Sequence, residues 1–205
     1  MYEKYFKRLL DILLSLCALT VLAVPMVFFA LLIKLDSKGP VLFWQKRVGI
    51  HKQVFLMPKF RSMYTETPPD MPTHLLCEPE RWITRIGRVY RRFSIDELPQ
   101  LYSILTGSMS FVGPRPALWN QADLIAERDK YGANDVLPGL TGWAQINGRD
   151  ELAIPEKARL DGEYVRNLSF RFDCKCILGT FGKVMFHEGV IEGSARCGED
   201  VSAEQ

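Results

Sequence analysis

Two adjacent carboxylates, Asp96 and Glu97, stand in the stretch RRFSIDELPQL, directly after a pair of arginines. Carboxylate oxygens are ligands that Mg²⁺ accepts, and a carboxylate can also attack phosphorus to give an acyl phosphate. Neighbouring residues of a helix point about 100° apart, so the two acids cannot chelate one ion symmetrically. This favours different roles for them, one as a nucleophile and the other at a metal ion.

The same residues also have a purely structural explanation. Ser94 is a good helix N-cap, Glu97 follows three residues later as in a capping box, and acids stabilise the positive end of a helix. Pro99 fits better if the helix begins later, with Asp96 itself as the cap. Either version predicts a helix that ends near residue 105. Its apolar face would consist of Leu98, Leu101, Tyr102 and Leu105.

Basic residues in segments with restricted backbones extend the acid pair towards a phosphate site. Arginines in loops rich in glycine and proline are suited to hold planar anions through paired hydrogen bonds. Together with the two acids they predict a diphosphate bound with a divalent metal ion. The candidate phosphate-binding residues are Lys59, Arg61, Arg88, Arg91, Arg115 and Arg149.

Other chemistries find little support in the sequence. The three histidines lie far apart, and DCKC (173–176) has no second cysteine pair, so a zinc site is not expected. There is neither a Walker sequence nor a G-x-G-x-x-G motif. The net charge is only +2, and no basic stripe carries interleaved aromatics, so nucleic acid is not an expected partner. Five scattered cysteines fit a reducing cytoplasm.

The first element that must position these groups is the uncharged apolar stretch of residues 12–33. As a helix it would be about 33 Å long, roughly the hydrocarbon thickness of a bilayer. A signal peptide has a shorter apolar core and a cleavage site of small residues, which is not evident here. The stretch therefore predicts membrane contact, and a buried core helix is the less favoured alternative.

Pro25 lies in the second half of this stretch and predicts a kink near residues 21–25. Basic residues flank both ends of the stretch, so the positive-inside rule gives little asymmetry. A helix–break–helix hairpin that enters and leaves one leaflet satisfies both observations. A plain kinked span satisfies the residues equally well.

The rest of the chain predicts a mainly helical α+β domain. Residues 41–48 and 53–63 are β-like and predict a small hairpin. Residues 106–116 are rich in glycine and proline and predict irregular structure, and 64–80, with four prolines, predicts a loop. Helical patterns cover residues 84–90, 94–105, 117–131, 155–168 and 173–187.

The last of these helices, residues 173–187, carries an apolar stripe that suits either the core or a membrane surface. The expected organisation is a membrane element over residues 1–36 and a catalytic domain over 37–190. A flexible tail is expected over 191–205.

The stretch RRFSIDELPQLYSILTGSMSFVGPRP closely resembles the core signature of the bacterial sugar transferases, also called monotopic phosphoglycosyl transferases. KFRSM before it and LPGLTGWAQINGRD after it resemble other blocks of the family in the same order. The resemblance covers residues 2–187 and is to the family's small members. It implies a re-entrant membrane hairpin broken at Pro25, then a compact cytosolic domain with interfacial amphipathic helices. The chain departs from the family at Val24, where members often carry a serine.

The resemblance implies transfer of a phosphosugar from a UDP-sugar to polyprenyl (undecaprenyl) phosphate, with release of UMP. Asp96 matches the nucleophile that forms a covalent phosphosugar intermediate, and Glu97 completes an acidic dyad tied to Mg²⁺. Arg91 and Arg115 match arginines placed near the phosphates. Such a reaction would be the first membrane step of bacterial glycoconjugate assembly.

The implied location is the cytoplasmic face of the bacterial inner membrane, with membrane lipid as a partner and downstream glycosyltransferases as candidate partners. Two other readings of the residues stay open. One is a membrane-bound glycosyltransferase that moves the sugar alone and releases UDP. The other is a membrane scaffold that binds nucleotide or lipid without turnover.

Overall fold

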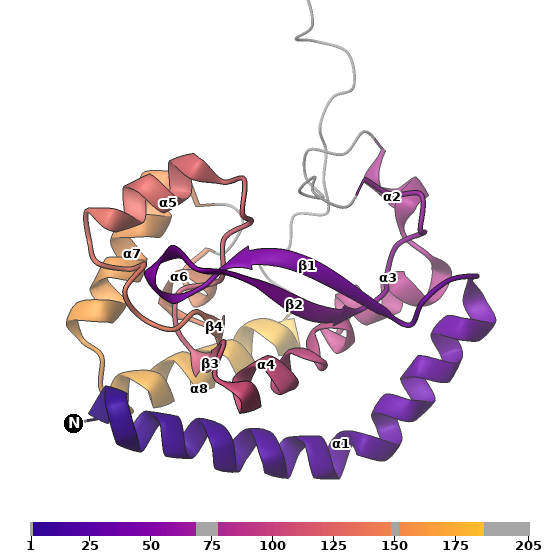
Figure 1. Cartoon of the computed structure of the whole chain (residues 1–205), viewed down its shortest axis with the longest axis horizontal. Helices are drawn as coiled ribbons and strands as arrows, with labels where there is room; N and C mark the ends of the chain where they lie inside the picture. The colour runs from indigo at the N-terminus through magenta and orange to yellow at the C-terminus, as the bar shows by residue number, and fades with distance from the viewer. Residues whose placement is uncertain (1, 69–77, 149–151, 187–205) are drawn as a thin grey trace, which may run out of the picture.

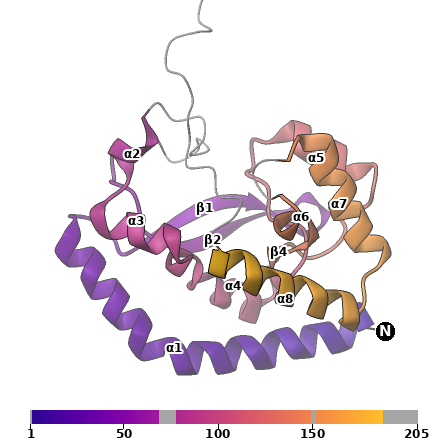
Figure 2. The ribbon, with the colours of Figure 1, turned by 180° about the vertical axis from the view of Figure 1, so that it is seen from behind.

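The structure is a computed structural model that describes residues 2–68, 78–148 and 152–186. A long N-terminal helix lies along one side of a mixed, mainly helical domain (Figures 1 and 2). The predicted α+β class, with an apolar N-terminal helix and a small antiparallel hairpin, is confirmed. The expected tail over 191–205 and most of the proline-rich segment lie outside the described residues.

The element order follows the sequence patterns closely. A π-helical turn, η1 (Tyr2–Lys7), leads into α1 (Arg8–Asp36), and β1 (Leu42–Val48), η2 (Ile50–Lys52) and β2 (Val54–Phe60) come next. The middle of the chain forms α2 (Pro79–Trp82), α3 (Arg85–Arg92), η4 (Ile95–Glu97), α4 (Gln100–Thr106) and β3 (Ser110–Val112). The last elements are α5 (Ala122–Asp129), β4 (Gly139–Thr141), α6 (Trp143–Ile146), α7 (Ile154–Arg166) and α8 (Phe170–Phe186).

The long helix α1 is bent near its middle, in the part that contains Pro25, and both of its ends turn towards the rest of the molecule (Figure 1). Proline lacks the N–H that a helix needs at this point, which explains the predicted bend. Residues Tyr5–Asp36 are long and apolar enough to cross a membrane by length and composition. Exposed apolar side chains of the helix include Leu9, Leu13, Leu16, Val21, Val24, Val27, Phe28, Leu31 and Leu35.

The inner side of α1 packs on two clusters of buried residues, one under each limb. Under the N-terminal limb, Leu19 and Leu22 contact a cluster that contains Met57 and Ile104. Under the C-terminal limb, Ile33 packs with residues of β2 and α3, in a second cluster with Phe60 and Tyr90 at its centre. Burial of this apolar surface at about 25 cal/mol per Å² fixes α1 against the domain.

The two ends of α1 also hold the segment that carries the acid pair. Arg8 donates to the carbonyls of Ile104 (2.6 Å) and Leu105 (2.7 Å), the last turn of α4. At the other end, a carboxylate oxygen of Asp36 accepts from the backbone N–H of Ile86 (3.1 Å) in the first turn of α3. Helix termini leave such groups without partners of their own, so both contacts stabilise the α3–α4 segment.

The N-terminus is tied to α8 through one buried carboxylate. Asp173 accepts from the Lys7 ammonium (2.5 Å), the Tyr2 hydroxyl (2.6 Å) and the Tyr164 hydroxyl (2.8 Å). A buried carboxylate needs such partners, because its oxygens would otherwise lose the hydrogen bonds of water. This network explains why α8 packs beside the start of α1.

The β1–β2 hairpin is antiparallel, with Leu42 opposite Phe60 and Val48 opposite Val54. A second pairing was not expected. Strand β3 lies inside the glycine- and proline-rich segment predicted to be irregular, and it pairs in parallel with β4. The pairing depends on glycines, since a Cβ on Gly113 would lie 2.4 Å from the Leu137 carbonyl and one on Gly139 would lie 2.1 Å from the Gly113 nitrogen.

Candidate active site

The acid pair lies in a short 3₁₀ turn, η4, between α3 and α4, and does not cap the following helix. Ser94 has a positive φ of 55° and its side chain makes no capping hydrogen bond, so the predicted capping box is wrong. Helix α4 begins only at Gln100, with Pro99 as its N-cap residue. The carboxylates of Asp96 and Glu97 are therefore available to other groups.

Glu97 is held by two cations from different parts of the chain. Its Oε1 atom accepts a hydrogen bond from Lys59 on β2 (3.3 Å) and a very short one from Arg115, which follows β3. All three side chains are largely buried, Glu97 with 12% and Arg115 with 25% of the side chain exposed. Charge-assisted hydrogen bonds of this kind are stronger than neutral ones and fix the carboxylate in one position.

Asp96 has a different environment from its neighbour. Burial raises the pKa of the Asp96 carboxyl to about 6, against the opposing effect of Lys59, and the nearby Glu97 raises it further. Arg91 and Arg115 favour the charged carboxylate. Burial in turn lowers the pKa of Lys59, although Glu97 opposes that change. Desolvated acids and cations thus lie side by side, as in many functional sites.

The backbone around these groups is packed too closely for side chains at two glycines. A Cβ on Gly87 would lie 1.9 Å from the carbonyl oxygen of Ser62, so only glycine lets α3 approach the end of the hairpin. A Cβ on Gly142 would lie 2.1 Å from the Gly113 carbonyl. The first contact positions α3, which carries Arg91, and the second positions the segment that carries Arg115.

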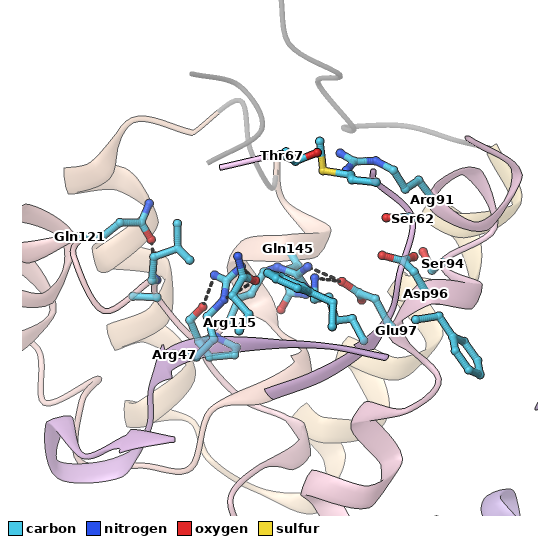
Figure 3. Close-up of a pocket in the computed structure, with 18 of the residues that line it drawn as sticks. Arg47, Ser62, Thr67, Arg91, Ser94, Asp96, Glu97, Arg115, Gln121 and Gln145 are labelled. Atoms are coloured by element: carbon cyan, nitrogen blue, oxygen red, sulfur yellow. Dashed lines mark hydrogen bonds and ion pairs between the residues drawn. The ribbon is translucent and has the colours of Figure 1, made fainter. Parts of the chain in front are cut away.

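The site opens into a cavity of about 630 Å³ (Figure 3). In the close-up, Asp96 and Glu97 lie at one side, Arg115 and Gln145 lie in the middle, and Gln121 lies at the far side. Arg47 lies beside Arg115 in this view, and its guanidinium donates to the carbonyl of Pro116 (2.9 Å). The cavity is also lined by Leu118, Leu124, Arg128, Ile154, Lys157 and Asp161.

The comparisons with known proteins agree with the motif blocks. The family described as bacterial sugar transferase matches residues 2–187. An uncharacterized sugar transferase, EpsL, of Bacillus subtilis strain 168 is 41% identical over 184 residues, which are 90% of this chain and 89% of the relative.

This chain belongs to the bacterial sugar transferase family.

Two relatives of this sugar transferase have names that state a substrate. The undecaprenyl-phosphate glucose phosphotransferase of Komagataeibacter xylinus is 45% identical over 190 residues, 88% of this chain and 36% of the relative. The UDP-glucose:undecaprenyl-phosphate glucose-1-phosphate transferase of Escherichia coli K12 is 37% identical over 194 residues, 88% of this chain and 40% of the relative. The chain therefore spans well under half the length of these two proteins.

Four of the six predicted phosphate-binding residues line the cavity, namely Lys59, Arg61, Arg91 and Arg115. The Arg61 guanidinium, however, donates to the carbonyls of Ser37 and Lys38 and to the Ser37 hydroxyl, so it fastens the end of α1. Arg88 is exposed on α3 and does not line the cavity. Arg149 lies outside the described residues. Phosphate binding by each of these residues stays a prediction.

Several residues at the cavity were not predicted from the sequence. Arg47 and Gln121 stand in segments without a motif for phosphate or sugar binding, and tertiary folding brings them to the site. Gln145 lies in the block LPGLTGWAQINGRD, but the block did not single it out as a site residue. The Oε1 atom of Gln145 is buried and has no hydrogen-bond partner among the residues that the structure describes, while its amide nitrogen donates to the carbonyl of Leu140 (2.9 Å). A buried acceptor of this kind is suited to receive a hydrogen bond from a ligand.

The donor set fits Mg²⁺ only as part of a complex with substrate. Within residues 2–68, 78–148 and 152–186 no group of three or more histidine, cysteine or acidic side chains forms a complete cage for a metal ion. Mg²⁺ commonly binds through one or two carboxylates, several waters and the phosphates of its substrate. Asp96 and Glu97, at the wall of a cavity with several cations, match that pattern.

Proposed function

We propose that this sugar transferase moves a phosphosugar from a UDP-sugar to polyprenyl phosphate and releases UMP. One observation carries the proposal: a partly buried Asp96 lines a cavity beside Glu97, which Lys59 and Arg115 hold in place. The names of the relatives, which include undecaprenyl-phosphate sugar phosphotransferases, support the substrate classes.

In the proposed first step, a carboxylate oxygen of Asp96 attacks the phosphorus that bears the sugar. The bond from that phosphorus to the oxygen bridging the two phosphates breaks, and UMP leaves with the bridging oxygen. The product is an aspartyl phosphosugar. In the second step an oxygen of the lipid phosphate attacks the same phosphorus, which frees Asp96 and forms the polyprenyl-diphosphate sugar.

The shape of the cavity suits this order of events. An in-line displacement places the leaving group opposite the nucleophile. From Asp96 the cavity runs past Glu97 and Arg115 towards Gln121, so UMP would leave in the direction of Arg115 (Figure 3). The guanidinium of Arg115 is then placed to balance the charge that develops on the leaving phosphate.

The proposal requires Asp96 to be ionised when it attacks. Burial disfavours the charged form, whereas Lys59, Arg91 and Arg115 favour it. When bound, Mg²⁺ would supply further positive charge to the carboxylate and to the diphosphate. Asp96 and Glu97 would hold the ion, while Lys59 and Arg115 keep the Glu97 carboxylate in a fixed orientation.

The proposed location is the cytoplasmic face of the bacterial inner membrane, with α1 as a re-entrant hairpin. The bend in α1 turns both of its ends towards the domain, and its outward side carries exposed apolar residues (Figure 1). A helix of this form would enter and leave one leaflet and keep the cavity close to the headgroups. The phosphate of a polyprenyl lipid lies at that depth.

The test is nucleotide release by purified protein in nanodiscs with polyprenyl phosphate, Mg²⁺ and a panel of UDP-sugars. We expect lipid-dependent UMP from one donor, and no UMP from the Asp96→Asn variant. When polyprenyl phosphate is left out, the wild-type protein should release at most one UMP per chain and gain the mass of the phosphosugar.

Two results would overturn the proposal. Release of UDP would indicate a glycosyltransferase that moves the sugar alone. No release from any donor, combined with unchanged nucleotide binding by Asp96→Asn, would indicate a scaffold without turnover.

A further inference from the structure

The outer face of α3 carries three arginines that the cavity does not use. Arg85, Arg88 and Arg92 are exposed, and among the described residues none of them forms an ion pair with a carboxylate. Exposed arginines often contribute nothing beyond solubility, so their position relative to α1 decides what they can do.

One side of α3 packs against the C-terminal limb of α1. Ile86 and Tyr90 belong to the buried cluster shared with α1, and the Tyr90 hydroxyl donates to the carbonyl of Phe29 (2.7 Å). The Asp36 carboxylate at the end of α1 accepts from the Ile86 N–H. Both ribbon views place α3 directly beside this limb of α1 (Figures 1 and 2).

Successive residues of a helix are about 100° apart, which orders the other side chains around α3. Going round the helix from Ile86 in one direction, Phe93 and Val89 come next. They are large apolar side chains that are 52% and 47% exposed. An apolar band therefore continues the exposed apolar surface of α1 onto α3.

Farther round the helix in the same direction, the three arginines follow the apolar band. Going from Ile86 in the other direction leads through Gly87, which packs on Ser62, to Arg91 at the cavity. The order from α1 outwards is thus apolar band, arginines, cavity. Helices that lie in a membrane interface have this profile, with apolar residues in the acyl boundary and cations at the phosphates.

We propose that the outer face of α3 docks onto anionic phospholipid headgroups, with Arg85, Arg88 and Arg92 on the phosphates and Val89 and Phe93 below them. The inference rests on the proposed insertion of α1 into the bilayer. Docking fixes the roll of α3, because the helix cannot rotate without lifting the arginines from the phosphates. It thereby holds Arg91, and the turn with Asp96, at the level of a lipid phosphate.

The test uses a fluorescent label on α3 in the full chain reconstituted in nanodiscs. An environment-sensitive dye is attached at Val89→Cys, and emission is compared between phosphatidylcholine alone and phosphatidylcholine with phosphatidylglycerol. Cys176 stays in place because it is buried, and the other cysteines are replaced by serine. The replaced cysteines are Cys17, Cys77, Cys174 and Cys197.

We expect the emission of the parent protein to shift to the blue when phosphatidylglycerol is present. Replacement of Arg85, Arg88 and Arg92 by glutamine should lower the ratio of docked to undocked protein, roughly fivefold per arginine. Replacement of the same three residues by lysine should preserve the shift, since the charge is retained. The lysine variant also separates loss of charge from loss of folding.

A matched control removes three exposed cations at the other end of the molecule, Lys52, Lys130 and Arg159, by substitution with glutamine. This control should respond to phosphatidylglycerol as the parent does. The proposal is overturned if the parent shows no lipid-dependent shift, or if the α3 glutamine variant shifts as the parent does. Because the readout is docking and not turnover, its outcome is independent of the nucleotide-release test.

Discussion

Two places in this sugar transferase hold acids among cations, and their surroundings differ. One contains Asp161, and the other contains the acid pair of Asp96 and Glu97. Asp161 on α7 pairs with Arg128 on α5 through two bonds of 2.8 and 2.6 Å, and the side chains are 1% and 5% exposed. Glu97 is similarly held by two cations and lines the same cavity as Asp161, but a second acid, Asp96, stands directly beside it. Both arrangements contain desolvated acids, so burial alone does not distinguish a structural pair from a reactive site.

The difference lies in how the charges are matched. Two nitrogens of Arg128 reach the same carboxylate oxygen of Asp161, and this pair joins two helices. Burial raises the pKa of Asp161, while Arg128 opposes the rise. Around the acid pair, two acids lie near three cations whose donors face a cavity of about 630 Å³. Several cations that line one cavity are suited to a ligand with several negative charges, such as a diphosphate.

The largest expected effect is on turnover, from Asp96→Asn. If Asp96 is the nucleophile, the substitution should lower the rate of UMP release by at least about 10³-fold. Unfolding should be as difficult as in the wild type or more so, because asparagine avoids the cost of burying a charge. Nucleotide release and denaturant unfolding in detergent are the two measurements. Retention of full activity would exclude Asp96 as the nucleophile.

Asp161→Asn should show the converse pattern. Removal of one partner leaves the Arg128 guanidinium buried without a counter-charge, a change that typically costs about 3–5 kcal/mol of unfolding free energy. Both residues line the cavity but are not part of the acid pair, so in protein that remains folded the activity should fall far less than in Asp96→Asn. An unchanged midpoint of unfolding would contradict the structural role assigned to this pair.

These two regions also show what the sequence could and could not reveal. The adjacent acids of η4 and the arginines near them were recognisable because they are local and belong to a motif. The pair of Arg128 and Asp161 was not, since its members are separated by 33 residues and no local pattern connects them. The same holds for β3, which pairs with β4 (Gly139–Thr141) and not with its sequence neighbours.

Elements with strong local patterns were predicted well. The apolar run of α1 and the alternation in the hairpin carry their structure in their own residues. The helix predicted over 94–105 failed at its start, because Ser94 adopts a left-handed conformation and the acids occupy a separate turn. The contact of Arg61 with the end of α1 could not be predicted from the sequence either, because only the folded chain brings these carbonyls to its guanidinium.

An intermediate effect is expected from Gly87→Ala, which tests the packing that supports the acid end. The new Cβ would lie 1.9 Å from the Ser62 carbonyl oxygen, so α3 must shift. Overpacking of this kind costs about 1–3 kcal/mol, partly offset by the roughly 1 kcal/mol that alanine gains over glycine in a helix. Activity should fall as well, because α3 carries Arg91.

Gly182→Ala on α8 is the matched control for this prediction. No atom of the described part of the chain would lie within 4 Å of a Cβ there, so the same substitution should leave activity intact and raise the unfolding free energy by up to about 1 kcal/mol. If both variants lose activity equally, close packing at Gly87 cannot be the cause. If Gly87→Ala behaves as the control does, α3 has more room than the contact with Ser62 implies.

The smallest effect is expected from a third kind of charge pair, which completes the comparison. Arg159 on α7 donates to both carboxylate oxygens of Glu156, with bonds of 2.9 and 2.7 Å, so this pair has two hydrogen bonds, as many as the pair of Arg128 and Asp161. Both of its side chains are nearly half exposed, however, so water and salt screen the interaction. Arg159→Gln should change neither nucleotide release nor the unfolding midpoint measurably. A loss comparable to that of Asp161→Asn would show that the number of hydrogen bonds, and not burial, sets the stability of such pairs in this fold.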